Sequence, residues 1–385
     1  MITRDTPVRL GLTFDDVLLV PQRTRATSRS LVDLSTTLSP EIRLHLPLIS
    51  ANAPFCTEGA MAIGMALAGG MGFVHRMTSI ERERDAVHRT KQHRFAPERF
   101  PHATCDGQGR LRVGAAVGVK GDYLARAEAM AEAGADLLVV DIAHGHADYA
   151  LAAISELAKR FPSLGIAAGN VATATGTRDL IGAGAQVVKV GIGPGSICTT
   201  RLVTGAGVPQ LTAVLDCVAV ARPHGVAVIA DGGLRTSGDI TKALAAGASA
   251  AMLGGMLAGA DESAGTLVER GGRRYKATTG FASLGVELTL KRLAGETIDP
   301  DELAAYVPEG VEATFPHRGP LANLLLQIAG GMRSGFSYSG AMSLPELWDK
   351  AELIRTSEAG RAENRPHALE AEGPRTQRAA LEKVA

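Results

Sequence analysis

The segment from Gly191 to Arg201 has the residue types of a loop that presents a reactive thiol. It reads Gly-Ile-Gly-Pro-Gly-Ser-Ile-Cys-Thr-Thr-Arg, so glycines and a proline precede Cys198, and two hydroxyls and a cation follow it. Glycines allow a tight turn that exposes backbone amides to an anion or carbonyls to a cation. A neighbouring positive charge favours the thiolate, which is the nucleophilic form of cysteine. The sequence therefore predicts Cys198 as a covalent nucleophile, against the alternative of a structural turn with an inert buried cysteine.

Two glycine pairs are candidates for holding a phosphate group. Asp231-Gly232-Gly233 and Gly254-Gly255 each follow a short apolar run. Backbone amides of glycine can approach phosphate oxygens closely, and an aspartate can accept hydrogen bonds from ribose hydroxyls. The alternative is that these glycines only end strands.

Histidine and acidic residues elsewhere give weaker signals. Asp141, His144 and His146 have a spacing found in metal sites, but the sequence offers no complementary third ligand, so an aspartate that faces a cofactor is favoured over a metal site. His75 fits either a strand cap or a role in the site. Glu287 fits either a position on a helix surface or a catalytic one.

These residues follow short apolar runs that alternate with helix-like stretches. Such alternation is typical of parallel strands covered by helices. Eight runs favour a closed α/β barrel of the TIM (β/α)8 type over a doubly wound sheet, which would need a phosphate fingerprint after its first strand. In such a barrel Ser50, Asn52 and Asn170 are expected at the same rim as the cysteine loop and the glycine pairs, where the strands end. The runs are residues 47–50, 72–75, 113–117, 137–141, 166–170, 187–190, 226–231 and 250–254.

The rest of the chain divides into an excursion and a tail. Residues 277–318 fit no barrel unit, and we expect them to form a flap over the C-terminal face of the barrel. Residues 361–385 are polar, with Pro, Glu and Arg, which predicts a disordered tail. Residues 1–360 are therefore expected to form a single catalytic barrel domain.

Composition excludes several classes of protein. The 385 residues include 40 basic and 40 acidic ones, so the charges balance. A nucleic-acid partner is therefore not predicted, because such a partner usually requires a basic surplus. Four cysteines without metal or disulfide spacing indicate a reduced, cytoplasmic protein. Residues 1–19 lack the apolar core of a signal peptide, and glycines interrupt the most apolar stretch, 243–258. No membrane partner is predicted.

The motifs resemble those of the IMP dehydrogenase / GMP reductase family, from Leu12 to about Gly360. The likeness is most specific in Ala168-Gly-Asn-Val-Ala172, in residues 189–201 around the cysteine, and in residues 207–211 and 230–234. It implies a barrel oxidoreductase, usually a homotetramer, that takes a small-molecule purine nucleotide and a nicotinamide cofactor. Only residues 94–110 stand where many dehydrogenases of the family insert a pair of regulatory domains, so that pair is expected to be absent.

The resemblance also assigns roles to residues. It implies that the thiol of Cys198 is the catalytic centre. It places the nucleotide's ribose phosphate and base near Ser50, Ser196, Asp231, Gly232, Gly233, Gly254, Gly255 and Glu309, the last at the purine edge. It places the cofactor near Asp141, Asn170, Gly191 and Gly193.

The two branches of the family share a first step, in which a thiolate attacks purine C2 and forms a covalent thioimidate. In the dehydrogenase, hydride leaves to NAD and an activated water releases the product, whereas in the reductase ammonia leaves and NADPH delivers a hydride. Dehydrogenases use an Arg-Tyr pair in the flap to activate the water, and residues 280–295 contain none. Residues 287–295 resemble the reductase, which implies Glu287 and Thr200 as the proton-handling pair.

We therefore expect a GMP reductase-like enzyme that uses NADPH, because hydrolysis without a water-activating group loses about 100- to 10,000-fold in rate. The first alternative is an IMP dehydrogenase that uses NAD. Residues 307–311, 319–321 and 333–335 resemble the dehydrogenase branch of the family. That alternative includes a monovalent cation such as K⁺ on the backbone carbonyls of Gly193, Gly195 and Cys198. The second alternative is a catalytically silent nucleotide-binding protein.

Two departures from the family favour an unusual substrate. Ala53-Pro54-Phe55 stands where the family usually has Met-Asp-Thr, in a loop that the resemblance places beside the base and cofactor. Thr278 stands where dehydrogenases usually have a phosphate-binding tyrosine. A modified purine nucleotide is therefore a further hypothesis for the substrate.

Overall fold

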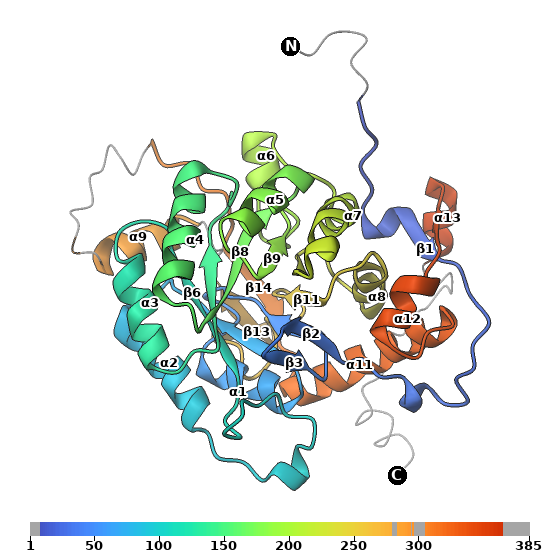
Figure 1. Ribbon diagram of the computed structural model, residues 1–385, viewed down its shortest axis with the longest axis horizontal. Helices are drawn as coiled ribbons and strands as arrows, with labels where there is room; N and C mark the ends of the chain where they lie inside the picture. Colours follow the sequence, from blue (N-terminus) through green and yellow to red (C-terminus); the bar gives the residue numbers. More distant parts are fainter. Residues whose placement is uncertain (1–7, 279–282, 294, 296–304, 365–385) are drawn as a thin grey trace.

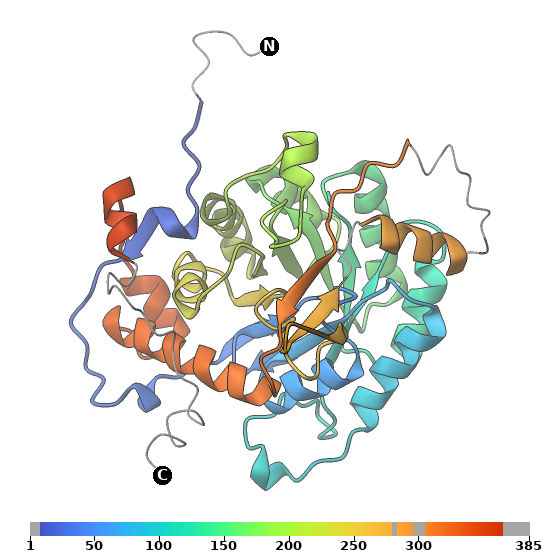
Figure 2. The same cartoon turned by 180° about the vertical axis from the view of Figure 1, so that it is seen from behind.

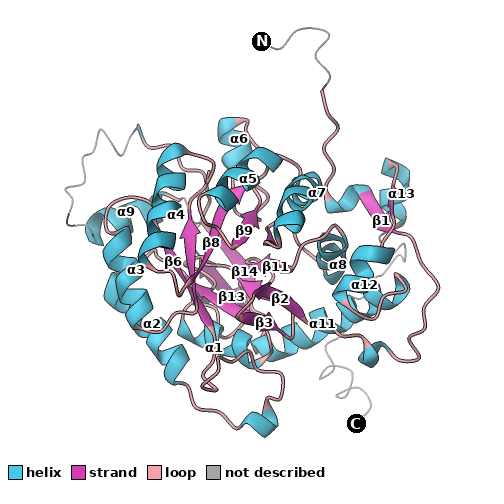
Figure 3. Cartoon of the chain, in the orientation of Figure 1, coloured by secondary structure: helices cyan, strands magenta, loops and turns pink. Residues whose placement is uncertain are grey.

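The computed structural model describes residues 8–278, 283–293, 295 and 305–364. Within them, eight parallel strands close a barrel in the order β10-β11-β4-β5-β6-β7-β8-β9. Figure 3 shows these strands in the middle of the molecule with helices around them. The (β/α)8 prediction is confirmed, and each of the eight apolar runs overlaps one strand. The strands are β4 (Leu48–Ser50), β5 (Met71–Val74), β6 (Val113–Val117), β7 (Leu137–Asp141), β8 (Gly165–Val171), β9 (Val187–Val190), β10 (Ala227–Asp231) and β11 (Ala250–Leu253).

A helix on the outside of the barrel follows each strand (Figure 1). In α4, the buried residues Ala150, Ala153, Ile154 and Leu157 recur at the spacing of one helical face, so this face packs on the strands while the opposite face stays polar. The covering helices are α1 (Gly59–Leu67), α2 (Ile80–Gln92), α3 (Tyr123–Glu132), α4 (Asp148–Arg160), α5 (Ala174–Gly182), α7 (Gln210–Ala221), α8 (Ser237–Ala245) and α11 (Leu321–Tyr338).

The alternation of side chains along each strand decides what fills the barrel. In β7, Leu137 and Val139 belong to the interior apolar cluster, whereas Leu138 and Val140 pack outward against the helices. The same period of two directs Asp141, at the end of β7, into the barrel. The polar ends of the strands thus continue an apolar interior toward the carboxyl rim.

A hairpin closes the other end of the barrel. It consists of β2 (Thr36–Ser39) and β3 (Ile42–Leu44), which pair antiparallel. Leu38, Ile42 and Leu44 of this hairpin belong to the same interior cluster as the inward side chains of the strands. The amino end of the barrel is therefore plugged by apolar side chains, and the open end is the carboxyl rim.

A small sheet at this rim combines residues before the predicted excursion with residues inside it, so the departure from the barrel begins earlier than residue 277. β12 (Thr266–Arg270), β13 (Arg273–Thr278) and β14 (Ala313–Pro316) pair antiparallel, and Figure 2 shows this orange sheet across the middle of the barrel. α9 (Leu284–Leu293) lies to one side. Residues 279–282, 294 and 296–304 of the predicted flap lie outside the described residues.

One strand near the start of the described chain pairs with one near its end, beside the barrel. β1 (Val17–Leu19) pairs antiparallel with β15 (Leu353–Arg355), and α12 (Leu344–Lys350) precedes this strand. α13 (Glu358–Glu363) reaches the start of the predicted tail, most of which lies outside the described residues. None of the helices in the described part of the chain is long and apolar enough to cross a membrane.

Candidate active site

A cavity of about 690 Å³ opens at the carboxyl rim, and the thiol loop forms part of its wall. Most of the residues that the sequence singled out line it. The residues that do not line it are Ser50, His75, His144, His146, Thr278 and Glu287. Those that line it are Asp141, Asn170, Gly191, Gly193, Gly195, Ser196, Cys198, Thr200, Asp231, Gly232, Gly233, Gly254, Gly255 and Glu309.

The cysteine loop is held by its own arginine. Arg201 donates hydrogen bonds to the carbonyl oxygens of Ile192 and Val208, at 2.9 and 2.6 Å. Gly193 has φ +74°, and a Cβ there would lie 2.5 Å from Cγ of Arg201, so only glycine fits. Arg201 thus fixes the loop that carries Cys198 and does not bond to the thiol itself.

The thiol stands next to a hydroxyl that is joined to a carboxylate. Sγ of Cys198 lies 3.2 Å from Oγ1 of Thr200, which donates to Oε2 of Glu309 at 2.7 Å. The backbone of the segment after α9 pairs with the loop, since the amide of Thr199 donates to the Glu309 carbonyl oxygen at 2.9 Å and Cys198 forms a bridge with Gly310. A chain of this kind can carry a proton between the carboxylate and a group bound beside the sulfur.

Glu287 lies elsewhere, in the first turn of α9. Burial and the nearby carboxylates of Glu287 and Glu309 raise the pKa of Tyr306, so this tyrosine stands near both acids. The structure therefore joins Thr200 to Glu309, whereas the sequence paired Thr200 with Glu287. Thr200 and Glu309 are 109 positions apart, and no local sequence pattern gives such a pairing.

The two glycine pairs lie against the cysteine loop. Gly232 and Gly233 have φ +86° and +74°, a region that favours glycine. A Cβ on Gly232 would lie 3.2 Å from the amide nitrogen of Gly195, and one on Gly255 would lie 2.7 Å from Oγ of Ser196. Backbone amides of both pairs and the thiol loop therefore share one part of the cavity, which suits a phosphorylated ligand.

A buried polar cluster forms the floor beside these loops. Nζ of Lys189 donates to Oδ2 of Asp231 at 2.9 Å and to Oδ1 of Asn170, and it lies 3.4 Å from Oδ1 of Asp141. The amide of Asn170 donates to the Gly191 carbonyl oxygen at 2.6 Å and to Asp231 at 2.9 Å. The sequence arguments did not assign a role to Lys189. The alternation of side chains along β9 could have indicated one, because it turns Lys189 into the barrel together with Val187.

Two acceptors in this wall have no hydrogen-bond partner. Oδ2 of Asp141 and Oε1 of Gln210 are buried and unbonded, and Nε of Arg76 lies 3.7 Å from the former. A buried acceptor without a donor is costly, so a ligand hydroxyl or amide that donates to it would be held firmly.

Ser50 and His75 have structural partners. Ser50 is fully buried, and its Oγ accepts from Oγ1 of Thr57 at 2.8 Å, which ties the loop after β4. Nδ1 of His75 accepts from the amide of Met77 at 3.1 Å, so His75 caps the end of β5. His146 pairs with Asp179, and the described part of the chain has no group of three His, Cys, Asp or Glu residues arranged to hold a metal.

The other cysteines are poor nucleophiles. Burial raises the pKa of Cys56 and of Cys217 to about 11, so both remain protonated at neutral pH. Cys105 is half-buried, burial raises its pKa too, and it does not line the cavity. Cys198 is thus the thiol that the fold presents to a ligand.

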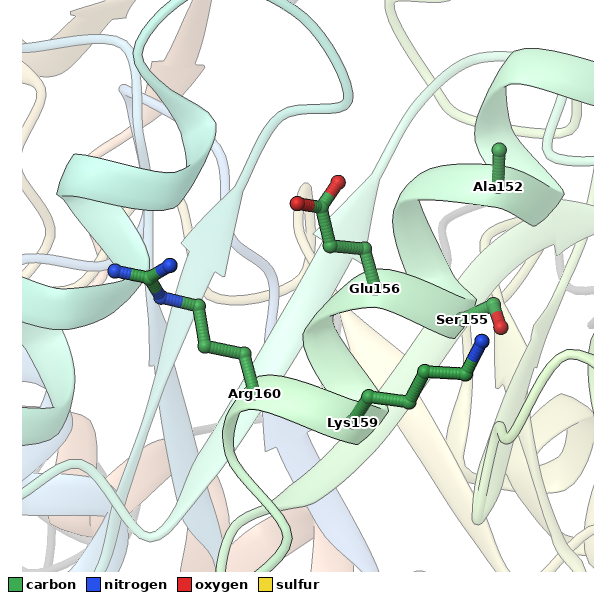
Figure 4. A pocket seen from close by; sticks show the side chains of 5 residues that line it. All are labelled: Ala152, Ser155, Glu156, Lys159 and Arg160. Atoms are coloured by element: carbon green, nitrogen blue, oxygen red, sulfur yellow. The ribbon is translucent and has the colours of Figure 1, made fainter.

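A second hollow, of about 520 Å³, lies on the outer face of α4 (Figure 4). Its lining residues come from this one helix, and two of them bond to α3, since Glu156 accepts from Tyr123 and Arg160 donates to Glu128. Neither a cysteine nor a glycine is among its lining residues. The rim cavity is therefore the candidate active site.

Comparisons with known proteins agree with this site. The model of the IMP dehydrogenase / GMP reductase domain matches residues 11–367. The chain belongs to this family. It is accordingly an NAD(P)-dependent oxidoreductase of purine nucleotide metabolism, as the motifs indicated.

Relatives of both branches resemble the chain. The inosine-5′-monophosphate dehydrogenase of Nitrosopumilus maritimus is 40% identical over 93% of this chain and 98% of its own length. The GMP reductase of Leishmania major is 37% identical over 93% of this chain and 96% of its own length. A crystal structure of a cysteine-to-alanine GMP reductase from Trypanosoma brucei in complex with guanosine 5′-monophosphate superposes with a TM-score of 0.88 at 34% identity, covering 96% of this chain and 100% of that one.

The chain is shorter than the Nitrosopumilus relative. The alignment with the Nitrosopumilus protein spans 466 positions, more than the 385 residues here, so that relative has residues with no counterpart in this chain. Between the end of α2 and the start of β6 the structure has a 3₁₀ turn at Pro97–Arg99 and a single bridge from Cys105 to Leu111. There is no room for inserted domains there, as the sequence predicted.

Proposed function

We propose that this protein is a GMP reductase-like enzyme that uses NADPH to convert GMP, or a close analogue, to IMP and ammonia. The contact between Thr200 and Glu309 beside Cys198 carries the proposal. Release of ammonia from C2 needs a proton at the leaving nitrogen, and this hydroxyl and carboxylate are placed to supply it.

In the proposed reaction, the thiolate of Cys198 adds to purine C2 and forms a C–S bond. The C2–N bond then breaks, and ammonia leaves with the bonding electron pair and a proton from Thr200, which Glu309 replaces. The covalent product is a thioimidate. The nicotinamide cofactor supplies the hydride that takes the place of the amino group at C2. The C–S bond then breaks, and the thiolate regains its electron pair.

The rest of the cavity supports binding of both ligands. Amides of the pairs Gly232-Gly233 and Gly254-Gly255 would hold the nucleotide's phosphate, and Asp231 would accept from its ribose hydroxyls. Ser196, beside Gly255, would add a hydroxyl to that phosphate site. The unbonded Oδ2 of Asp141 would accept from the cofactor beside Asn170, Gly191 and Gly193.

The second candidate is an IMP dehydrogenase, favoured by the identity with the Nitrosopumilus enzyme. It would need a group that activates water. The described chain has an Arg274-Tyr275 pair in β13, but neither residue lines the cavity. A K⁺ ion on the carbonyls of Gly193, Gly195 and Cys198 belongs to this candidate, and turnover that requires K⁺ over Li⁺ would support it.

One assay separates these candidates. Purified protein is mixed with GMP and NADPH, and separately with IMP and NAD, while the nicotinamide absorbance is followed. We expect absorbance to fall in the first mixture and to stay constant in the second. A rise in the second mixture alone would replace the reductase by the dehydrogenase. No change in either, with both nucleotides bound, would indicate a binding protein without catalysis.

An altered purine is a further proposal for the substrate. Ala53 and Phe55, from the loop that departs from the family, line the cavity, and Phe55 stacks on Phe315 of β14 with ring centroids 6.0 Å apart. Such an apolar wall favours a base with a less polar ring edge. A panel of purine nucleotide analogues tests this, since higher kcat/KM for an analogue than for GMP supports it. Equal or better turnover of GMP would contradict it.

We also propose a cytoplasmic homotetramer. The four cysteines are free thiols, as in a reducing compartment. Large apolar side chains are exposed near the rim, among them Leu202 at 87% exposure and Val307, which suits burial between subunits. Light scattering during gel filtration measures the mass, and a monomer would contradict the proposal.

A further inference from the structure

Four neighbouring barrel strands each contribute one polar side chain to a single buried cluster. β7 provides Asp141, β8 Asn170, β9 Lys189 and β10 Asp231. Nζ of Lys189 reaches three of these partners at once, with the two carboxylates at 2.9 and 3.4 Å. The lysine is only 3% exposed, so its charge has little water to stabilise it.

The charges in this cluster depend on one another. Burial lowers the pKa of Lys189, but the carboxylates of Asp231 and Asp141 outweigh it and hold that pKa above its usual value. The ammonium is therefore the counter-ion of both acids. Without it, both carboxylates would lose this counter-ion in a largely buried place, which is costly. The guanidinium of Arg76 lies 3.7 Å from Asp141 and is a second cation beside the cluster.

We propose that Lys189 is a positioning residue shared by the nucleotide and cofactor subsites. Its one ammonium holds the carboxylate of Asp231 in place for the nucleotide's ribose and the carboxylate of Asp141 in place for the cofactor. Both ligands therefore depend on the same side chain. This inference rests on the proposed function, which assigns Asp231 to the nucleotide and Asp141 to the cofactor.

An ordinary buried ion pair would not affect ligand binding. The chain contains one that matches the Lys189 cluster in burial and in charge. Lys91 is also almost fully buried and also bonds to two aspartates, Asp106 and Asp136, each at 2.9 Å. None of these three residues lines the rim cavity. Loss of either lysine is expected to lower the stability of the fold, but only loss of Lys189 is expected to weaken the binding of the nucleotide and the cofactor.

The experiment measures binding by calorimetry, with no turnover required. GMP and NADPH are titrated separately into the wild type and into the variants Lys189→Met, Lys189→Arg and Lys91→Met. We expect Lys189→Met to raise the Kd of both ligands by roughly tenfold or more, which is the loss of a hydrogen bond to a charged group. Lys189→Arg keeps the positive charge, so its affinity for each of the two ligands is expected to fall less than that of Lys189→Met. Lys91→Met is expected to leave both Kd values within about twofold while lowering Tm.

The outcomes separate this inference from the proposed function. Binding of both ligands to the wild type, with only one of them weakened in Lys189→Met, would overturn the shared role and leave the proposed function in place. Should Lys189→Met fail to fold, parallel weakening of both ligands in Lys189→Arg supports the inference, and an effect on one alone overturns it. Failure of the wild type to bind GMP, IMP, NADPH and NAD would overturn both proposals.

Discussion

The hydroxyl of Thr200 donates a 2.7 Å hydrogen bond to the carboxylate of Glu309 and lies 3.2 Å from the sulfur of Cys198. This contact joins the segment after β9 to the segment after α9, and all three residues line the rim cavity. It is the geometric basis for proton transfer in the proposed reaction.

The first prediction concerns this pair. Thr200→Val and Glu309→Gln should each lower kcat by about 100-fold or more, because each removes a link in the same proton path. The double variant should lose little beyond the single ones, since groups that act as a unit are not additive. Steady-state kinetics of the four proteins checks this. Losses that multiply would show that the two residues act separately.

The same assay decides the role of Glu287. Because Glu287 lies outside the cavity lining, Glu287→Gln should keep kcat within about threefold of the wild type. A loss as large as that of Glu309→Gln would restore the pairing of Glu287 with Thr200 that the sequence suggested.

The second prediction concerns the nucleophile. Cys198→Ala should lower turnover by at least about a thousandfold, because the covalent step is lost, while the nucleotide's Kd stays within about threefold. Cys105→Ala is the control, since this half-buried thiol lies outside the cavity lining. Mass spectrometry of the wild type during turnover should also find the nucleotide attached to Cys198. Attachment to another cysteine would contradict the assignment.

The third prediction concerns the phosphate site. A Cβ at Gly255 would lie 2.7 Å from Oγ of Ser196, so Gly255→Ala should push this side chain and raise the nucleotide's Kd by roughly tenfold. The free nucleoside should lose much less, since it has no phosphate. Gly107→Ala is the control, because a Cβ there meets nothing within 4 Å. Equal losses for nucleotide and nucleoside would place the phosphate elsewhere.

The fourth prediction concerns stability in acid. Burial acts to raise the pKa of Asp106, but its bonds to Lys91 and to backbone amides outweigh this and hold the pKa well below its usual range. The unfolded chain then binds more protons at this site, so the stabilisation is present at neutral pH and is lost as the pH falls below about 5. Asp106→Asn should lower the free energy of unfolding at pH 7 by on the order of 1–3 kcal/mol. It should also reduce the acid limb, which is the fall of this free energy as the pH drops below about 5.

Denaturant titrations at several pH values measure this effect. Asp349→Asn, at an exposed carboxylate of α12, is the control and should keep the wild-type acid limb. An unchanged acid limb in Asp106→Asn would mean that other carboxylates carry the pH dependence.

Much of the fold followed from the sequence, because the signals are local. Strand and helix periods depend on neighbours along the chain, so the eight runs were placed to within one or two residues of the observed strands. The demand for glycine at Gly232 and Gly233 is also local, since it comes from their own φ angles. The family followed from contiguous motifs around Cys198.

Barrel closure decided which of those residues touch. Thr200 bonds to Glu309 and not to Glu287, and Ser50 turns inward to Thr57, because the path of the backbone sets these partners. Lys189 gains its role only when β7 to β10 stand side by side and bring two carboxylates to one ammonium. A hydrogen bond depends on tenths of an ångström between distant segments, and such distances exist only after the strands close and the segment after α9 settles on the rim.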